Sequence, residues 1–417
     1  MSILRIKGGK ALSGTVRVHG AKNSVLPIIA ASILCAGETV IHNCPDLTDV
    51  HAATKILRHL GCSAEMRGCS LYINTKALKR TDIPDALMRE MRSSVIFLGA
   101  ILARAGEATL SMPGGCELGP RPIDMHLAAL RSMGAVIDET GGNILCHTAG
   151  KLCAARIDLS QPSVGATENS ILAAAGCEGT TVITNAAREP EIWDLQEYLK
   201  KIGIHVSGAL SSIVTVEGGR AYSGCEHSVI PDRIVATTYM AACAATHGKV
   251  EITGIMPEHI ANVSDVFFAM GCEIKTGKDR LYINADRILR APRPVVTRPY
   301  PGFPTDAQPP VMAACLMAEG TTAFIENIFQ NRYRHISELQ RMGADIKVEG
   351  RVAMVTGVQR LHGAPVAATD LRGGAALVIA ALCADGESDV SGMHHLDRGY
   401  DRIEQALSSL GAEIERM

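Results

Sequence analysis

The stretch Leu60-Gly61-Cys62-Ser63-Ala64 has the pattern of a helix end that runs directly into a β-strand. An apolar residue followed by glycine recurs in the same setting at a spacing of roughly 70 residues. The further copies are Met133-Gly134, Ile202-Gly203, Met270-Gly271, Met342-Gly343 and Leu410-Gly411. This regular spacing predicts that the chain is a sixfold internal repeat.

A second signature lies about thirty residues upstream of each pair, and it has the pattern of an apolar, alanine-rich helix followed by an alternating strand. It is clearest from Ile29 to Ile41 and from Val311 to Ile325, and the other four copies begin near Val95, Asn169, Val235 and Gly374. A unit of this kind cannot bury its apolar helix alone, so several copies are expected to pack their helices together. The sequence therefore predicts an α/β fold built from six similar units.

A chain of 417 residues is too long for one compact core, so we expect two domains with three repeats in each. The predicted seam is at Pro231, where a strand stops and Asp232 introduces the next helix. One domain would comprise residues 1–21 with 231–417, and the other residues 22–230. Residues 4–6 and 14–18 are predicted to form a strand pair before the first repeat helix, which is expected to begin at Asn23. The alternative is that these strands belong with the last repeat.

Composition excludes several function classes. The formal net charge is −2 and the 41 basic residues are scattered, so nucleic acid is not an expected partner. No apolar run reaches the roughly 20 residues that span a bilayer, and the chain start lacks a signal core, so we expect a cytoplasmic protein without membrane insertion. The 13 cysteines are dispersed and form no CxxC pair, which predicts reduced thiols; neither a metal nor a cofactor is expected.

One cysteine differs from the others in its surroundings. Cys116 follows two glycines in the Gly- and Pro-rich segment 112–122, which is predicted to be a long exposed loop. Positive charge from Arg121 and His126 would lower the thiol pKa and make Cys116 reactive. An incidental loop cysteine is the alternative.

Lys22 and Asn23 stand where the first repeat helix begins, so the lysine ammonium can project beside free backbone N–H groups and bind phosphate or carboxylate. An ordinary solvated lysine is the alternative, and the residue alone favours it. Asp306 lies just before the apolar helix of the fifth repeat. It is a helix-capping or first-turn acid, which the residue alone favours, or a general base at a domain edge, and the two roles are not exclusive.

Five arginines occur near helix starts or in turns that contain glycine or proline. Each alone is more often a surface charge, but arginine suits bidentate binding of carboxylate and phosphate. Together they predict a converging anion site: Arg92, Arg121, Arg332, Arg372 and Arg398.

Eight motifs in chain order resemble the UDP-N-acetylglucosamine 1-carboxyvinyltransferase family over the whole chain. They are Gly20-Ala21-Lys22-Asn23, Pro113-Gly114-Gly115-Cys116 with Arg121-Pro122, Ser163 to Thr167, Asn185 to Glu191, Phe303-Pro304-Thr305-Asp306, Asn331-Arg332, Asp370-Leu371-Arg372 and Asp397-Arg398-Gly399-Tyr400. The resemblance implies a two-domain inside-out α/β barrel of six β-α-β-α-β-β repeats, three per domain, with Cys116 on a mobile loop of the second domain.

The resemblance also implies the reaction. The enolpyruvyl group of phosphoenolpyruvate passes to the 3-hydroxyl of UDP-N-acetylglucosamine with release of phosphate, as the first committed step of peptidoglycan synthesis. Cys116 would be the proton donor and the site of alkylation by fosfomycin, and Asp306 would take the hydroxyl proton. Phosphate would be held by Lys22, Arg121 and Arg398, with Arg372 near the carboxylate.

The further substrate contacts that the resemblance implies are Asn23, Arg92, Arg121, Pro122, Ile123, Asp124, Met125, Ser163, Val164, Gly165, Ile328, Arg332 and Asp370. Two positions depart from the family: Gln161 stands where many members carry Lys, and Gln330 where Glu is common. Neither change removes a catalytic group. The oligomeric state is left open.

Two rival functions were weighed. The sister enolpyruvyl transferase that acts on shikimate 3-phosphate has the same six-unit fold, but its loop lacks the Pro-Gly-Gly-Cys element found at 113–116. A non-catalytic repeat scaffold would be expected to have lost the acid, the base or the anion-binding residues, and this chain keeps all of them.

Overall fold

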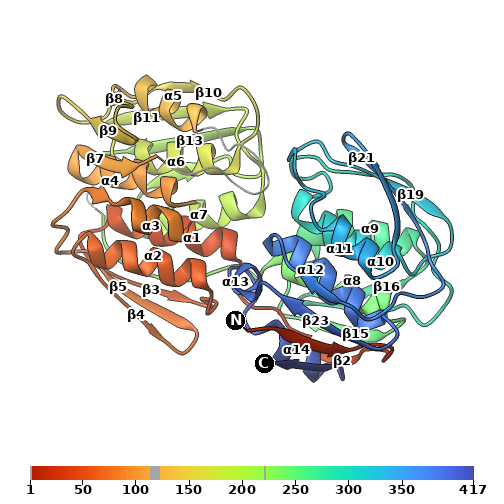
Figure 1. Cartoon of the computed structure of the whole chain (residues 1–417). Helices are drawn as coiled ribbons and strands as arrows, with labels where there is room; N and C mark the ends of the chain where they lie inside the picture. Colours follow the sequence, from red (N-terminus) through yellow and green to blue (C-terminus); the bar gives the residue numbers. More distant parts are fainter. Residues whose placement is uncertain (1, 92, 113–122, 220–221) are drawn as a thin grey trace. The chain divides into compact units, whose positions relative to one another are not determined.

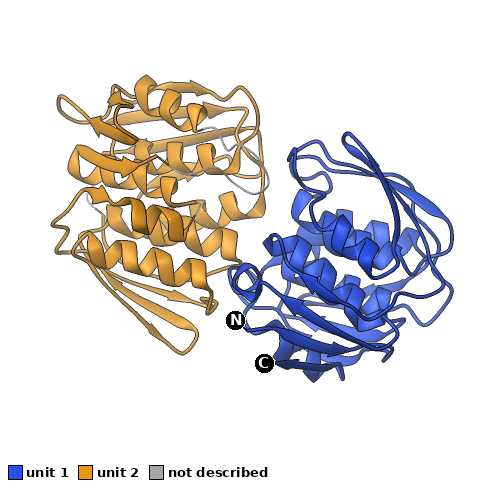
Figure 2. Cartoon of the chain, in the orientation of Figure 1, with its two compact units in different colours: residues 1–19, 117–119, 231–417 blue, residues 20–116, 120–230 orange. Residues whose placement is uncertain are grey.

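The computed structural model describes residues 2–91, 93–112, 123–219 and 222–417 (Figure 1). They form two compact units, each of which is considered by itself (Figure 2). Unit 1 contains residues 2–19 and 231–417, and unit 2 contains the described residues between 20 and 230. Each unit is built from four-stranded sheets around a centre of buried helices.

The three sheets of unit 2 have the same strand order. In each, a short edge strand pairs in parallel with the strand next to it, and the other two strand pairs are antiparallel. The orders are β14 (Glu226–Ser228), β3 (Glu38–His42), β5 (Ser70–Asn74), β4 (Ser63–Arg67); β6 (Asp82–Ile83), β7 (Glu107–Ser111), β9 (Asn143–His147), β8 (Val136–Asp138); and β10 (Arg156–Asp158), β11 (Gly179–Thr184), β13 (Ile213–Gly218), β12 (His205–Ser207).

Unit 1 repeats the same order. Its sheets are β2 (Ser13–Arg17), β15 (Lys249–Thr253), β17 (Arg280–Asn284), β16 (Glu273–Thr276); β18 (Val295–Val296), β19 (Thr321–Ile325), β21 (Val352–Thr356), β20 (Asp345–Glu349); and β22 (Pro365–Ala367), β23 (Glu387–Ser391), β1 (Leu4–Lys7), β24 (Glu413–Arg416). The described residues thus contain six four-stranded sheets, three in each unit, which confirms the sixfold α/β repeat.

The first two strands do not pair with each other, so the predicted pairing is wrong, but the alternative that they belong with the last repeat is confirmed for β1. Strand β1 lies between β23 and β24, antiparallel to both, and completes the sheet of the sixth repeat. Strand β2 pairs in parallel with β15 in the sheet of the fourth repeat. The backbone N–H and C=O groups of a buried strand need hydrogen-bond partners. Strands β1 and β2 find these partners in the sheets of the sixth and fourth repeats, each of which would otherwise have three strands.

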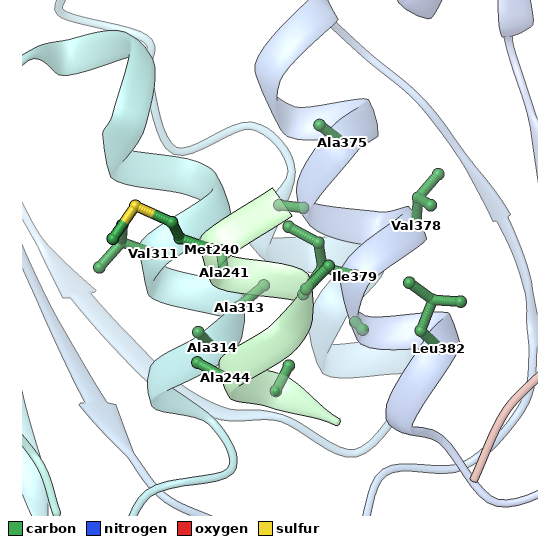
Figure 3. Close-up of a cluster of buried hydrophobic side chains, with 14 of the residues drawn as sticks. Met240, Ala241, Ala244, Val311, Ala313, Ala314, Ala375, Val378, Ile379 and Leu382 are labelled. Carbon is green, nitrogen blue, oxygen red and sulfur yellow. The ribbon is translucent and has the colours of Figure 1, made fainter. Parts of the chain in front are cut away.

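The centre of unit 1 is formed by α8 (Arg233–Ala245), α10 (Gln308–Cys315) and α12 (Leu371–Cys383), which are buried on nearly every side. Figure 3 shows Met240 of α8 beside Val311 of α10, and Ala244 beside Ala314. Alanines at these contacts allow the helix backbones to approach closely. A helix that is apolar all round belongs inside a core, and the predicted alanine-rich helices occupy that place.

Unit 2 has the corresponding core helices α1 (Lys22–Ala31), α4 (Phe97–Ala105) and α6 (Val164–Ala174). Shorter elements connect the repeats: α3 (Asp85–Glu90), α13 (Met393–Leu396) and the 3-10 turns η1 (Ser32–Leu34), η2 (Ser94–Ile96), η3 (Pro257–Ile260) and η4 (Thr305–Ala307).

The six apolar-glycine pairs end the outer helices α2 (Thr48–His59), α5 (Asp124–Ser132), α7 (Pro190–Lys201), α9 (Ala261–Ala269), α11 (Ile336–Arg341) and α14 (Ile403–Ser409). Each apolar member is buried, and each glycine has a φ between 88° and 102°. After α2, the N–H of Cys62 donates to the carbonyl of Leu57 at 3.0 Å, which closes the helix end. Glycine recurs at these positions because the left-handed conformation is strained for other residues.

In the part of the chain that the structure describes, no helix has both the length and the apolar character needed to cross a membrane.

Candidate active site

Asp306 lies in the turn η4, immediately before α10. Its Oδ1 accepts a hydrogen bond from Nη2 of Arg332 at 2.9 Å, and its Oδ2 accepts one from Nε of Arg372 at 3.1 Å. The N-cap position of α10 belongs to Ala307. Asp306 is thus not the N-cap of α10, but it is the acidic residue in the first turn of η4, which confirms the first-turn part of the expectation, and both of its carboxylate oxygens also bind arginines.

Arg332 is fixed by several contacts although only 1% of its side chain is exposed. Its Nε and Nη2 donate to the carbonyl of Thr305 at 3.2 and 2.7 Å, and its Nη1 lies 3.9 Å from Oδ1 of Asp370. The guanidinium carbon also lies 5.7 Å from the ring centre of Phe329. These contacts hold a buried positive charge beside two carboxylates.

Arg372 reaches the same place from the first turn of α12. Asp370 caps this helix, because its Oδ1 accepts from the backbone N–H groups of Arg372 and Gly373, both at 3.0 Å. The Arg372 guanidinium lies 5.4 Å from the ring centre of Tyr400, whose hydroxyl is 2.9 Å from Oγ1 of Thr238. Among the described residues, Nη1 of Arg372 is buried without a hydrogen-bond partner, so one donor is available to an anion.

His335 completes this cluster. A Cβ placed on Gly373 would lie 2.5 Å from Oδ2 of Asp370 and 2.8 Å from Cβ of His335, so only glycine fits between them. Burial lowers the pKa of His335 to about 4, which leaves the imidazole neutral near pH 7. A neutral ring adds no further positive charge beside Arg332. The sequence analysis missed His335, and no local pattern marks it.

In unit 2, Lys22 is the first residue of α1 and its Nζ lies 2.6 Å from Oδ2 of Asp49 in α2. The two side chains are 10% and 1% exposed, so the alternative of a solvated lysine is wrong. A Cβ on Gly20 would lie 1.8 Å from the carbonyl oxygen of Asn43, which explains why the motif before Lys22 contains glycine. Asn23 follows Lys22 and is half-buried. Asp49 was not predicted.

Ser163, Val164 and Gly165 form the start of α6, where the Ser163 hydroxyl accepts a 3.4 Å hydrogen bond from the N–H of Ala166. A hollow of about 600 Å³ runs along α5 and β10, and its lining includes Ile123, Asp124 and Met125. Its lining is mixed, because apolar residues lie there beside the charged residues Arg131, Glu139 and Asp158.

His126, on α5, is buried, and its Nδ1 accepts a 3.0 Å hydrogen bond from the Asn169 amide nitrogen. Burial lowers the pKa of His126 to about 4. The expectation that His126 contributes positive charge near Cys116 is therefore wrong, because the buried ring is neutral near pH 7.

This neutral histidine predicts a pH dependence of stability. The folded protein binds fewer protons than the unfolded chain between the reference pKa of about 6.5 and the folded value of about 4. The free energy of unfolding should therefore fall as the pH drops through that range, by up to about 3 kcal/mol for His126. Denaturant unfolding at pH 7 and pH 5 measures the slope. His126→Asn should reduce the slope and leave the part that comes from His335, whereas exposed His147→Asn should not change it. An unchanged slope in His126→Asn would contradict the assignment.

Several predicted site residues lie outside the cluster around Asp306. Cys116, Arg92, Arg121 and Pro122 lie outside the described residues. Arg398 is half-buried between α13 and α14, two residues before the Tyr400 that contacts Arg372. Ile328 is exposed in the loop after β19, as are Gln161 and Gln330 in their own loops. The structure therefore brings Asp306, Arg332, Asp370 and Arg372 together in unit 1, while Lys22 and the Ser163 segment belong to unit 2.

Comparison with known proteins adds three findings. The family model described as EPSP synthase (3-phosphoshikimate 1-carboxyvinyltransferase) matches residues 6–407. A UDP-N-acetylglucosamine 1-carboxyvinyltransferase 2 from Caldanaerobacter subterraneus is 48% identical over 100% of both chains. A UDP-N-acetylglucosamine 1-carboxyvinyltransferase 1 from Symbiobacterium thermophilum is 46% identical over 99% of this chain and 94% of its own.

Among solved structures, the enolpyruvyl transferase NikO from Streptomyces tendae has a TM-score of 0.90 and 27% identity, with 100% of this chain and 99% of NikO covered. EPSP synthase from Acinetobacter baumannii has a TM-score of 0.76 at 19% identity and covers 100% of each chain, which is a likeness of fold alone.

Proposed function

The chain belongs to the UDP-N-acetylglucosamine 1-carboxyvinyltransferase family, within the wider EPSP synthase family, and from that membership we propose its activity. It transfers the enolpyruvyl group of phosphoenolpyruvate to the 3-hydroxyl of UDP-N-acetylglucosamine and releases phosphate, the first step of peptidoglycan synthesis. The proposed location is the cytoplasm. The observation that carries the reaction type is the Asp306 carboxylate held between Arg332 and Arg372, because it joins a base to anion-binding groups.

The reaction needs an acid and a base. A proton added to the methylene carbon of phosphoenolpyruvate makes the adjacent C2 electrophilic, and the sugar oxygen forms a bond to C2 as its proton leaves. The resulting tetrahedral ketal loses a proton from the new methyl group and expels phosphate, which restores the double bond. By family resemblance, Cys116 is the proposed proton donor and Asp306 the base that takes the hydroxyl proton.

The arginine contacts suggest how Asp306 becomes a base. Its Oδ2 accepts from Arg372, and Nη1 of Arg372 has no partner among the described residues. A substrate carboxylate that draws the Arg372 guanidinium towards itself would free Oδ2 for the sugar hydroxyl. Arg332 would keep Oδ1 in place through its 2.9 Å hydrogen bond. Preorganised charges of this kind are often worth a few kcal/mol at the transition state.

The remaining substrate contacts are proposed from the family resemblance. Lys22, Arg121 and Arg398 are proposed to hold phosphate, with Arg92, Arg332 and Asp370 near the substrates. The N-terminus of α6 at Ser163 suits the diphosphate of the sugar nucleotide. The hollow lined by Ile123, Asp124 and Met125 suits the uridine.

Phosphate release from phosphoenolpyruvate, measured with UDP-N-acetylglucosamine and in parallel with shikimate 3-phosphate, tests the proposal. Release with the UDP-sugar alone is the expected result. Release with shikimate 3-phosphate alone would keep the reaction type but overturn the acceptor. If a folded protein releases no phosphate with either acceptor, the proposed activity is contradicted.

A further inference from the structure

Glu326 joins the two segments that carry Asp306 and Arg332. It directly follows β19, and 1% of the residue is exposed. Its Oε1 accepts from the backbone N–H groups of Ile328 and Phe329 at 2.8 and 3.0 Å. Its Oε2 accepts from the Thr305 hydroxyl at 3.0 Å. One buried carboxylate therefore fixes the start of the 326–332 loop and the turn that contains Asp306.

Thr305 connects this carboxylate to the cluster. Its hydroxyl donates to Glu326, while its carbonyl oxygen accepts two hydrogen bonds from Arg332. Arg332 in turn donates to Asp306, the next residue in the chain. The contacts form a closed ring from Glu326 through Thr305 and Arg332 and back along the loop. A displacement of Thr305 would therefore move the base and its arginine together.

The base of the loop is anchored independently. The N–H of Asn327 donates to Oγ1 of Thr297 at 2.9 Å, and its side-chain amide donates to the Thr297 carbonyl at 3.3 Å. The sheet end is thus held by Thr297, and the Thr305–Glu326 hydrogen bond links the start of the loop to the Asp306 turn, in addition to the Arg332 contacts at the end of the loop. The Phe329 ring, near the Arg332 guanidinium, follows the backbone that Glu326 fixes.

We propose that Thr305 and Glu326 are positioning residues for the transfer reaction. They hold the side chains of Asp306 and Arg332 in the correct relative positions without touching the substrates. The inference rests on the proposed function, in which Asp306 takes the hydroxyl proton. A reacting group misplaced by about 1 Å can lose a hundredfold in rate. A second set of hydrogen bonds that orients a catalytic carboxylate therefore affects the chemical step more than substrate binding.

Thr305→Val tests this directly, because it keeps the side-chain shape but removes the donor to Glu326. We expect kcat to fall between about tenfold and a hundredfold, with KM for both substrates within about threefold. Thr305→Ser restores the hydroxyl and should recover kcat to within about threefold of the wild type. A Thr305→Val enzyme with wild-type kcat, or a Thr305→Ser enzyme as slow as Thr305→Val, would overturn the proposal.

The matched control is Thr322→Val. Thr322 lies on β19 in the same unit, is buried, and donates a 2.8 Å hydrogen bond to the Pro292 carbonyl without any link to Asp306. It should lower the melting temperature and leave kcat unchanged. An equal loss of kcat in Thr322→Val would show that any buried hydroxyl in this unit has the same effect, and would also overturn the proposal.

Glu326 provides a second test should Thr305→Val fold poorly. In Glu326→Gln the amide oxygen can still accept from the two backbone N–H groups while its nitrogen donates to the Thr305 hydroxyl, so kcat should stay within about threefold. The kcat of Glu326→Ala should fall by as much as that of Thr305→Val. The variant that carries both substitutions should have a kcat no lower than that of Glu326→Ala. Additive losses of kcat in the double variant would overturn the proposal that Thr305 and Glu326 act together. A wild-type enzyme inactive with both acceptors would instead contradict the proposed function.

Discussion

Replacing Asp306 with Asn should lower kcat by about a thousandfold, because the amide cannot take the sugar hydroxyl proton and general base catalysis contributes roughly 10²–10⁴. The amide also cannot accept charge-assisted hydrogen bonds equally from Arg332 and Arg372, which now donate to Oδ1 and Oδ2. Steady-state phosphate release at saturating substrates measures the loss.

The control is Asp345→Asn on β20, an exposed carboxylate of the same unit, which should leave kcat unchanged. Thermal unfolding of both variants separates a catalytic effect from a loss of fold. A folded Asp306→Asn enzyme with more than about a tenth of wild-type kcat would rule out the base role and leave Asp306 as a tether for the arginines.

Replacing Lys22 with Gln should have the second large effect, on stability and on substrate binding together. The Lys22–Asp49 pair is buried, and removing one partner of a buried ion pair costs about 3–5 kcal/mol. If Lys22 also holds the phosphate, KM for phosphoenolpyruvate should rise by at least about tenfold. Denaturant unfolding and initial rates measure the two effects.

Lys55→Gln is the matched control. Lys55 lies 2.8 Å from Glu90, close to the spacing of the buried pair, but the two side chains are 53% and 40% exposed. Exposed ion pairs contribute about 0–1 kcal/mol, so this variant should be close to wild type. Equal stability losses in both variants would contradict the importance of burial, and an unchanged KM in Lys22→Gln would remove Lys22 from the phosphate site.

The two units use buried charge in different ways. In unit 1 two arginines and two carboxylates share one cluster beside a neutral His335, so an anion bound there would meet charges that are already arranged. In unit 2 the buried charges include the pair of Lys22 and Asp49 at the start of α1 and the pair of Asp194 and His227. Placing cations beforehand avoids reorganisation at the transition state.

Local patterns were sufficient to predict much of this protein. The apolar-glycine pairs, such as Leu60-Gly61, predicted the repeat because a helix end needs a left-handed residue and a buried apolar neighbour wherever it occurs. The alanine-rich segments predicted the core helices because a helix that is apolar all round has to be buried. The family resemblance supplied Asp306, Arg332, Asp370 and Arg372 as candidates, which the structure then brings into one cluster.

Long-range partners could not be read in this way. Nothing near Lys22 indicated that Asp49 would be its partner, and nothing near Asp306 indicated that Glu326 or His335 would lie close to it. Strands β1 and β2 were expected to pair locally, yet they complete sheets whose other strands lie more than 200 residues away. His126 was expected to be charged, but burial keeps it neutral.

The sequence by itself therefore determined the repeat, the core helices, the reaction family and the identity of the chemical groups, because each depends on local periodicity or on a motif within a few residues. Only the tertiary structure decided which charges are paired, which histidines are neutral and which strands close the sheets. Those properties depend on burial and on distances between segments remote in sequence, because burial, nearby charges and hydrogen bonds together set the free energy of a charged or polar group.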